Sequence, residues 1–235
     1  DRGLWFVRNE FELTSGEELV VAHQENLRQQ KSLVKVDRKR QLTRARCDAG
    51  TFIVKEFRQA SFRGPWRPDL ASWRNSYALE AAGIPACKCY AWLKAREGKG
   101  FLILEDLGER TLEKVLRDGR EAEIKHRRLA NAGALTGLLH RHGIAHGDLN
   151  PANFMLLDHE PRGRGRMALV DSDRLYFYVG LPPHKRCVRN LCQLLGRYPR
   201  WMTETEARHL LASYEQSLDG EMPVSDAVMR GLGGG

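Results

Sequence analysis

Apolar and polar residues alternate in short runs through the first part of the chain. Three neighbouring runs rich in β-branched residues, "SLVKVD", "QLTRARCD" and "TFIVKEF", are separated by "RKR" and by "AG". Strict alternation is typical of half-buried strands, so these runs predict an antiparallel meander. Two more strands are predicted at "CKCYAWLKARE" and "GFLILEDLG", around a charged turn at "REGKG".

Two segments in this part have the spacing of helices instead. A helix is predicted over residues 16–30, and its apolar stripe is Leu19, Val20, His23 and Leu27. Ser15 and Glu18 have the spacing of a capping box at the start of that helix. A second helix is predicted in "PDLASWRNSYALEAAG", where Gly83 stops it and Pro85 lies just beyond.

Helical spacing dominates after Gly108. One helix is predicted in "ERTLEKVLRDG", and a longer one in "EAEIKHRRLANAGALTGLLHRHG" has the apolar face Leu129, Ala132, Leu135, Leu138 and Leu139. A polar loop, a hairpin of "NFMLLD" and "RMALVDSD", two helices at "KRCVRNLCQLLGR" and "ETEARHLLASYEQSL", and a flexible "GLGGG" tail are expected to follow. Because strands come first and helices after, we predict an α+β chain of two lobes, residues 1–106 and 107–235.

The composition is typical of a globular protein. The 235 residues are 42% hydrophobic and 29% charged, and no apolar run reaches the roughly 18 residues that a membrane span requires. The first residues lack the basic-then-apolar layout of a signal peptide. Five cysteines, an odd number without a CxxC pair, favour free thiols in a reducing compartment. A cytoplasmic location is therefore expected.

The net charge of +8 indicates an anionic partner. Residues 31–46 hold seven Lys or Arg side chains against one acid, Asp37. This excess favours an anionic contact over a merely solvated turn, and nucleotide, nucleic acid, anionic lipid and phosphorylated glycan all remain compatible with it.

Candidate chemistry is concentrated in "IAHGDLNPANFMLLD". Asp148 and Asn153 stand at the two ends of "DLNPAN", the D-x-x-x-x-N spacing of a kinase catalytic loop. Asp171 follows "MALV" at a strand end, where a metal-binding carboxylate is expected, although a turn-capping Asp also fits. Lys55 lies within the apolar run "FIVKEF" and points inward with Ile53, although a lysine that reaches water from an edge strand also fits. Phosphoryl transfer requires this set of a phosphate-binding cation, metal ligands and an Asp beside the nucleophile.

These segments resemble the lipopolysaccharide core kinases, the Kdo and heptose kinase family of the protein-kinase-like superfamily. The resemblance runs from about residue 33 to residue 197. It is carried by "TFIVKEF", "LEAAGIPA", "FLILEDL", "LHRHGIAHGDLNPANFML", "ALVDSDR" and "RCVRNLCQLLGR". It implies a two-lobed protein-kinase-like fold with a small antiparallel-sheet N-lobe and a mainly helical C-lobe.

The resemblance also implies roles for particular residues and the cofactors ATP and Mg²⁺. Lys55 would bind the ATP phosphates, and the backbone from Glu105 to Leu107 would contact adenine. Asp148 would align or deprotonate the acceptor hydroxyl. Asn153 and Asp171 would bind magnesium.

Two histidines near the loop are expected to have structural roles. By the resemblance, His146 would brace the loop. His140, on the preceding helix, is expected to pack rather than to react.

Three departures from the protein-kinase pattern shape the functional prediction. The turn in "KVDRKRQLTR" has no glycine, so a basic turn with Arg38, Lys39 and Arg40 would replace a Gly-rich loop, or would simply be solvated. The acidic partner of Lys55 stays open, because the expected position falls near Ser72, between Asp69 and Glu80. "DSD" stands where D-F-G is usual, and only a short segment follows, which disfavours a protein acceptor.

The sequence therefore predicts an ATP-dependent kinase that phosphorylates a Kdo or heptose hydroxyl of the lipopolysaccharide inner core. Its substrate would be the core glycolipid, and its basic surface would contact the anionic inner face of the inner membrane. A small-molecule phosphotransferase for an aminoglycoside or choline-like acceptor, and a pseudokinase scaffold, remain alternatives. A nucleic-acid-binding module is disfavoured because aromatic residues are not interleaved with the basic run. No protein partner is indicated.

Overall fold

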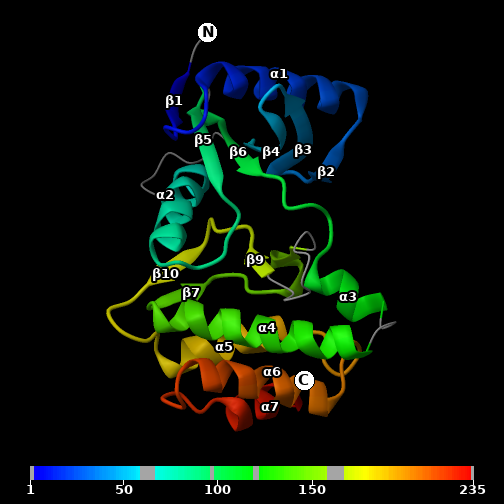
Figure 1. The fold of residues 1–235 in the computed structure, drawn as a ribbon, viewed down its shortest axis with the longest axis vertical. Helices are drawn as coiled ribbons and strands as arrows, with labels where there is room; N and C mark the ends of the chain where they lie inside the picture. The colour runs from blue at the N-terminus through cyan, green and yellow to red at the C-terminus, as the bar shows by residue number, and fades with distance from the viewer. Residues whose placement is uncertain (1–2, 59–66, 96–97, 119–121, 158–166, 234–235) are drawn as a thin grey trace. The chain divides into compact units, whose positions relative to one another are not determined.

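The structure is a computed structural model that describes residues 3–58, 67–95, 98–118, 122–157 and 167–233. The chain divides into two compact units, the first comprising Asp1–Ala78 with Cys87–Asp106 and the second Leu79–Ala86 with Leu107–Gly235. Each unit has its own apolar core. Figure 1 traces the chain through both units.

The first unit is built on one six-stranded antiparallel sheet in the order β1-β5-β6-β4-β3-β2. Its elements are β1 (Leu4–Val7), α1 (Leu13–Gln29), β2 (Leu33–Val36), β3 (Arg40–Cys47), β4 (Gly50–Phe57), α2 (Pro68–Ala81, whose last turn belongs to the second unit), β5 (Cys89–Lys94) and β6 (Gly100–Glu105). The meander β2-β3-β4 and the strands β5 and β6 confirm the predictions from alternation.

The two faces of β4 have different neighbours because successive side chains of a strand point to opposite sides. Phe52 and Val54 enter an apolar cluster with residues of α1, which lies across this face of the sheet (Figure 1). Phe57 points the other way, into a cluster with Trp92 and with Trp73 of α2. The sheet is therefore covered on both faces, and every side chain from Val54 to Phe57 is buried.

Buried polar contacts also tie α1 to the sheet. His23, on the predicted apolar stripe, bonds Thr43 through Nδ1 at 2.8 Å and Glu56 through Nε2 at 3.3 Å. All three side chains are buried, and this linkage accounts for a histidine among apolar residues.

The predicted start of α1 is wrong. The helix begins at Leu13, its N-cap is Glu12, and no side chain caps it. Ser15 is instead buried within the first turn, so the Ser15–Glu18 spacing does not form a capping box. The strand β1 was also missed, because it is only four residues long and pairs with β5, far along the sequence.

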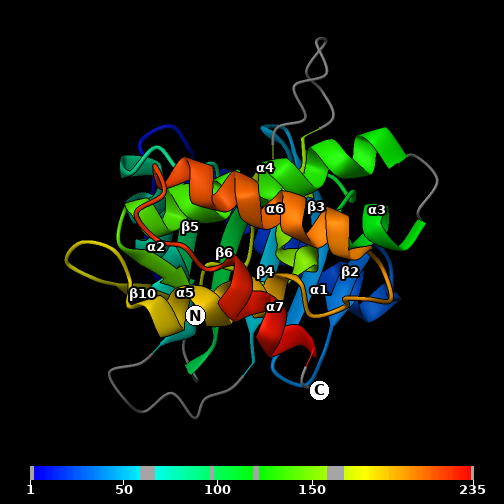
Figure 2. The same cartoon turned by 90° about the horizontal axis from the view of Figure 1, so that it is seen from below.

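The second unit is mainly helical. Its elements are α3 (Leu112–Asp118), α4 (Ala122–Arg141), β7 (Ile144–His146), a 3₁₀ turn η2 (Pro151–Asn153), β8 (Phe154–Leu156), β9 (Met167–Leu169), β10 (Leu175–Phe177), α5 (His184–Leu194), α6 (Glu204–Ser217) and α7 (Ser225–Gly233). The helix α6 lies alongside α4 (Figure 2). Glycines on α4 permit this approach, because a Cβ at Gly133 would overlap the Leu210 carbonyl oxygen.

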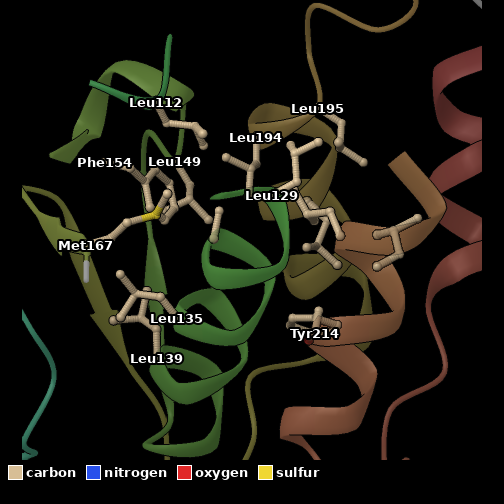
Figure 3. Packing of buried hydrophobic residues seen from close by; sticks show 14 of the residues in the cluster. Leu112, Leu129, Leu135, Leu139, Leu149, Phe154, Met167, Leu194, Leu195 and Tyr214 are labelled. Carbon is tan, nitrogen blue, oxygen red and sulfur yellow. The ribbon is translucent and has the colours of Figure 1, made fainter. Parts of the chain in front are cut away.

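The apolar face predicted for α4 forms the centre of this core. Leu129, Leu135 and Leu139 are buried in one cluster with residues of α3, β8, α5 and α6. Figure 3 shows Leu149, from the polar loop, close to Phe154 in the same packing. The loop is thus anchored by an apolar side chain placed next to its charged ones.

Several predictions for this unit need correction. The pairing of β10 with β7 was not foreseen, and neither was α7. Residues 231–233 of the predicted flexible tail form the end of α7. Residues 96 and 97 of the turn predicted at "REGKG", and the whole turn predicted at "HEPRGRGR", lie outside the described residues.

Candidate active site

The loop between β7 and η2 holds a buried histidine and an exposed aspartate two residues apart. His146 is the last residue of β7 and is almost fully buried, whereas Asp148 faces solvent. The backbone N–H of Asp148 donates to His146 Nδ1 at 3.0 Å. The imidazole therefore fixes the backbone of the loop while the carboxylate of Asp148 projects outward, which is the geometry of a brace.

Helix α5 holds the same loop through two amide side chains. Asn190 accepts from the backbone N–H of His146 at 3.0 Å and donates to its carbonyl at 2.6 Å. Gln193 donates to the Gly147 carbonyl at 3.3 Å and accepts from the Leu149 N–H at 3.4 Å. The loop backbone is thus bonded on both sides of Asp148.

Sequence reasoning missed both amides as site residues. The available signal was their spacing, since Asn190 and Gln193 lie three residues apart on a helix whose neighbours Cys187, Leu191 and Leu194 are buried. Polar residues on a buried helix face require partners. Here the partner is the loop backbone.

Asn153 and Asp171 are brought to the same loop. Asn153 Nδ2 donates to the Asp148 carbonyl at 2.8 Å, and the Asn153 carbonyl accepts from the Val170 N–H at 3.0 Å. The second bond holds Val170, the residue before Asp171, against the Asn153 backbone. In the second unit, therefore, the predicted residues Asp148, Asn153 and Asp171 lie together.

Asp171 has an unusual backbone conformation. Its φ is 60°, in the left-handed region that few residues other than glycine adopt. Such conformations cost about 1–3 kcal/mol and are concentrated at functional sites. The strain points to a constraint on where this carboxylate is held.

Burial lowers the pKa of His146, although the nearby carboxylates of Asp171 and Asp148 and the peptide groups of Val170 and Asp171 oppose the shift. A neutral imidazole is consistent with Nδ1 acting as an acceptor. His146 is therefore a structural group in its neutral form.

His140 packs, as expected, and does so within a buried network. Its Nδ1 bonds Tyr214 Oη at 2.9 Å, and its Nε2 bonds Asn190 Oδ1 at 3.1 Å. Burial lowers its pKa to about 4. The network connects α4, α5 and α6 behind the loop.

Lys55 lies in the first unit, in the middle of β4. It pairs with Leu42 of β3 and Leu102 of β6, so its strand is internal to the sheet. The side chain is only 4% exposed, and Nζ lies 5.0 Å from the centre of the Phe57 ring. The alternative of a solvent-reaching lysine on an edge strand is therefore wrong.

Asp69, one of the acidic residues near the position expected for the partner of Lys55, is bonded to other side chains. This carboxylate accepts two hydrogen bonds from Arg67, at 3.2 and 2.6 Å, and one from Trp92 Nε1 at 2.8 Å. Asp69 thus has its own set of partners. Ser72 is buried, and its hydroxyl finds no hydrogen-bond partner among the described residues.

Glu105 is the last residue of β6, and Leu107 lies two residues further along the chain. The Glu105 N–H donates to the Lys88 carbonyl at 2.9 Å, and the Glu105 carbonyl accepts a weak bond from Cys87 Sγ at 3.4 Å. Burial raises the pKa of the Cys87 thiol to about 12, so this group is a neutral donor.

The basic turn between β2 and β3 contains one carboxylate, that of Asp37, which binds the backbone of the turn. Asp37 Oδ1 accepts from the backbone N–H groups of Lys39 and Arg40, both at 2.8 Å. Lys35 Nζ and Arg40 Nε each lie 3.9 Å from Asp37 Oδ2. The two amides are therefore already occupied, which distinguishes this turn from a Gly-rich loop whose amides are open to phosphate.

A small antiparallel-sheet unit with a buried strand lysine, followed by a helical unit with this aspartate-bearing loop, defines a protein-kinase-like fold. Residues 67–214 match the profile of the lipopolysaccharide kinase (Kdo/WaaP) family, and the chain belongs to that family. The family predicted from sequence resemblance is confirmed.

Two known proteins illustrate the relationship. A protein of fowlpox virus (strain NVSL) described as a probable serine/threonine-protein kinase is 24% identical over 151 residues, which is 64% of this chain and 45% of the viral protein. The chain thus spans less than half the length of that relative. The structure titled "WaaP in complex with acyl carrier protein" superimposes with a TM-score of 0.67 at 18% identity, covering 98% of each chain. This likeness supports the fold.

Two further findings concern metals and membranes. Within the described residues, no group of three or more His, Cys, Asp or Glu side chains is arranged to hold a metal ion. No helix in that part of the chain is long and apolar enough to cross a membrane.

Proposed function

We propose that the protein transfers the terminal phosphoryl group of ATP to a sugar hydroxyl, on a Kdo or a heptose, of the lipopolysaccharide inner core. The observation that carries this proposal is the loop itself. Asp148 is exposed on a backbone held by His146, Asn190 and Gln193, with Asn153 bonded to the Asp148 carbonyl. A rigid loop that presents one carboxylate suits a reaction in which catalysis is mostly positioning.

In this proposal each predicted residue has one task. Asp148 orients the acceptor hydroxyl and accepts its proton. Lys55 binds the ATP phosphates, and the backbone from Glu105 to Leu107 contacts adenine. Residues 1–106 then serve as the nucleotide-binding lobe, and residues 107–235 as the lobe with the catalytic loop.

Asn153 and Asp171 would hold Mg²⁺. The bond from Asn153 Nδ2 to the Asp148 carbonyl fixes the amide so that Oδ1 remains as its acceptor, and Asp171 supplies a carboxylate. Oxygen ligands of this kind fit Mg²⁺, which usually takes one or two protein oxygens and completes its shell with water and phosphate. A pair of protein ligands is also compatible with the absence of larger acidic clusters in the described residues. The metal would neutralise charge on the transferring phosphate.

The acceptor and its location belong to the same proposal. An inner-core glycolipid is anionic, which suits a chain of net charge +8 that works in the cytoplasm at the anionic surface of the inner membrane. Because a structural neighbour was solved with an acyl carrier protein, binding of acyl carrier protein to this chain is a reasonable second measurement.

The test is transfer of label from γ-labelled ATP to purified core oligosaccharide. We expect the parent protein to label the oligosaccharide and Asp148→Asn to turn over about 10²–10⁴-fold more slowly, the usual contribution of general-base assistance. Asp219→Asn is the matched control, since Asp219 is exposed and pairs with Arg141 on the surface. It should keep parental turnover.

The outcomes separate the proposal from its alternatives. Nucleotide binding without any transfer would indicate a pseudokinase, and transfer to an aminoglycoside but not to the oligosaccharide would indicate a small-molecule phosphotransferase. Full turnover by Asp148→Asn would remove Asp148 from the chemistry.

A further inference from the structure

The strand β10 is attached to the loop that carries Asp148. Leu175 pairs with His146, and the Gly147 N–H donates to the Arg174 carbonyl at 2.6 Å. A Cβ at Gly147 would lie 2.8 Å from Arg174 Cβ and 3.2 Å from Tyr176 Cε2. The side chains of Arg174 and Tyr176 therefore pack directly against the residue that precedes Asp148.

Tyr176 in turn holds a second arginine. The guanidinium carbon of Arg186, in the first turn of α5, lies 4.5 Å from the centre of the Tyr176 ring. This cation–π contact favours a placement of the guanidinium over the ring. Tyr176 is 38% exposed and Arg174 is exposed, so these two residues face solvent.

Neither arginine is neutralised by its surroundings. Among the described residues, no carboxylate forms an ion pair with Arg174 or Arg186. A guanidinium fork is well suited to bind a carboxylate or a phosphate with two parallel hydrogen bonds. A guanidinium already oriented by a ring loses less freedom when it does so.

The negative charge of the nearby loop affects which acceptors can bind beside it. Asp148 is exposed on the loop, and its carboxylate would repel an acceptor that carries its own negative charge. A neutral sugar would need no such compensation. Two unpaired guanidinium groups beside the loop offset this repulsion for an acidic acceptor.

We propose that Arg174 and Arg186, with Tyr176 as the support of Arg186, form a subsite for an anionic group on the acceptor sugar. The ligand class is a sugar carboxylate or sugar phosphate close to the hydroxyl that Asp148 orients. This inference rests on the proposed function and names the part of the acceptor that the site recognises. Arg174 and Arg186 are binding residues in it, and Tyr176 is a positioning residue.

The experiment compares intact core oligosaccharide with the same material after removal of its phosphates and reduction of its carboxylates to alcohols. Arg186→Gln should raise KM for the intact acceptor about 10- to 100-fold, the range for a lost hydrogen bond to a charged group. Its kcat and its KM for ATP should stay near the parental values. On the uncharged acceptor, parent and variant should have the same KM.

Further variants separate orientation from charge. Tyr176→Phe keeps the ring and should resemble the parent, whereas Tyr176→Ala should resemble Arg186→Gln because the guanidinium loses its support. Arg208→Gln is the charge-matched control, since Arg208 is exposed and pairs with Glu204 on α6. It should leave KM for the acceptor unchanged.

Equilibrium binding of both oligosaccharides, measured by calorimetry without ATP, makes the inference independent of turnover. Failure of the parent to transfer phosphate would refute the proposed function, while a selective loss of affinity in Arg186→Gln would still support the subsite. Equal affinity and equal KM in Arg186→Gln and the parent would overturn the inference. A rise in KM for ATP instead would assign the two arginines to the nucleotide.

Discussion

Asp148 and Asp171 carry the same charge in different surroundings. Asp148 is exposed on a loop whose backbone is bonded on both sides. Asp171 is half-buried, has a φ of 60° and lies beside Asn153 and His146. These surroundings fit the roles proposed for the two residues, acceptor binding for Asp148 and magnesium binding for Asp171.

Replacing each aspartate by asparagine should therefore give different losses. Asp148→Asn should leave ATP affinity almost unchanged, because no nucleotide contact is assigned to it. Asp171→Asn should weaken nucleotide binding in the presence of Mg²⁺ and have little effect in its absence, because a metal ligand is lost. Fluorescence titration with a labelled nucleotide, with and without Mg²⁺, measures this contrast. Equal losses in the two variants would contradict the assignment.

His140 makes the stability of the protein depend on pH. Burial lowers its pKa to about 4, below the ordinary value of 6.5, so the unfolded chain binds more protons than the folded one between these values. The free energy of unfolding should therefore fall as the pH is lowered from about 6.5 towards 4, by roughly 3 kcal/mol from this residue alone. Urea titrations at several pH values measure the slope. His140→Gln should flatten it, and an unchanged slope would exclude His140 as its source.

At the scale of elements, the approach of α4 to α6 is controlled by glycine. A Cβ at Gly133 would overlap the backbone of α6, and one at Gly137 would meet Ser217 and the Tyr214 carbonyl. Backbone atoms cannot rotate away as a side chain can. A side chain at Gly133 would therefore force the two helices apart, whereas one at Gly137 would first displace the Ser217 side chain.

Gly133→Ala should accordingly lower the free energy of unfolding by about 1–3 kcal/mol, the usual cost of overpacking, although alanine favours a helix. Gly233→Ala is the control, because a Cβ there meets nothing within 4 Å. Thermal and urea unfolding of both variants measure the difference. A Gly133→Ala protein as stable as the parent would show that α4 and α6 adjust without cost.

Elements with long, regular patterns were predictable, and short ones were not. The apolar face of α4 and the alternation in β3 and β4 follow from burial on one side of a helix or strand. The strands β7 and β10 have three residues each and are fixed by pairing across the chain, which leaves almost no local signal. At Ser15 a local pattern was present but misleading. The Ser15–Glu18 spacing fits a capping box, yet Ser15 is buried inside the first turn of α1.

The site was predictable to a similar extent. Spacing and strand position singled out Asp148, Asn153, Asp171 and Lys55, whose roles remain predictions. The contacts that brace the loop could not be read locally, because Asn190 reaches His146 across 44 positions of the chain. Tertiary hydrogen bonds of this kind leave no periodic pattern in the sequence.

The charge of the whole molecule should govern its behaviour at a lipid surface. With a net charge of +8, the protein should bind vesicles that contain anionic lipid and release them as ionic strength rises from about 0.1 M to about 1 M, where the Debye length falls from about 10 Å to about 3 Å. Co-sedimentation measures the bound fraction, and zwitterionic vesicles are the control. The double variant Arg38→Gln/Lys39→Gln should need less salt for release. A bound fraction that does not change with ionic strength would argue against an electrostatic contact.

The turn at Asp37 has a consequence for the exchange of its amide hydrogens with solvent. Because the Lys39 and Arg40 N–H groups already donate to the Asp37 carboxylate, they should exchange slowly with deuterated water before any nucleotide is added. The amides of a glycine-rich phosphate loop become protected only when phosphate arrives. In this chain the turn is ordered by its own side chain, so nucleotide should change the deuterium uptake of residues 37–40 very little.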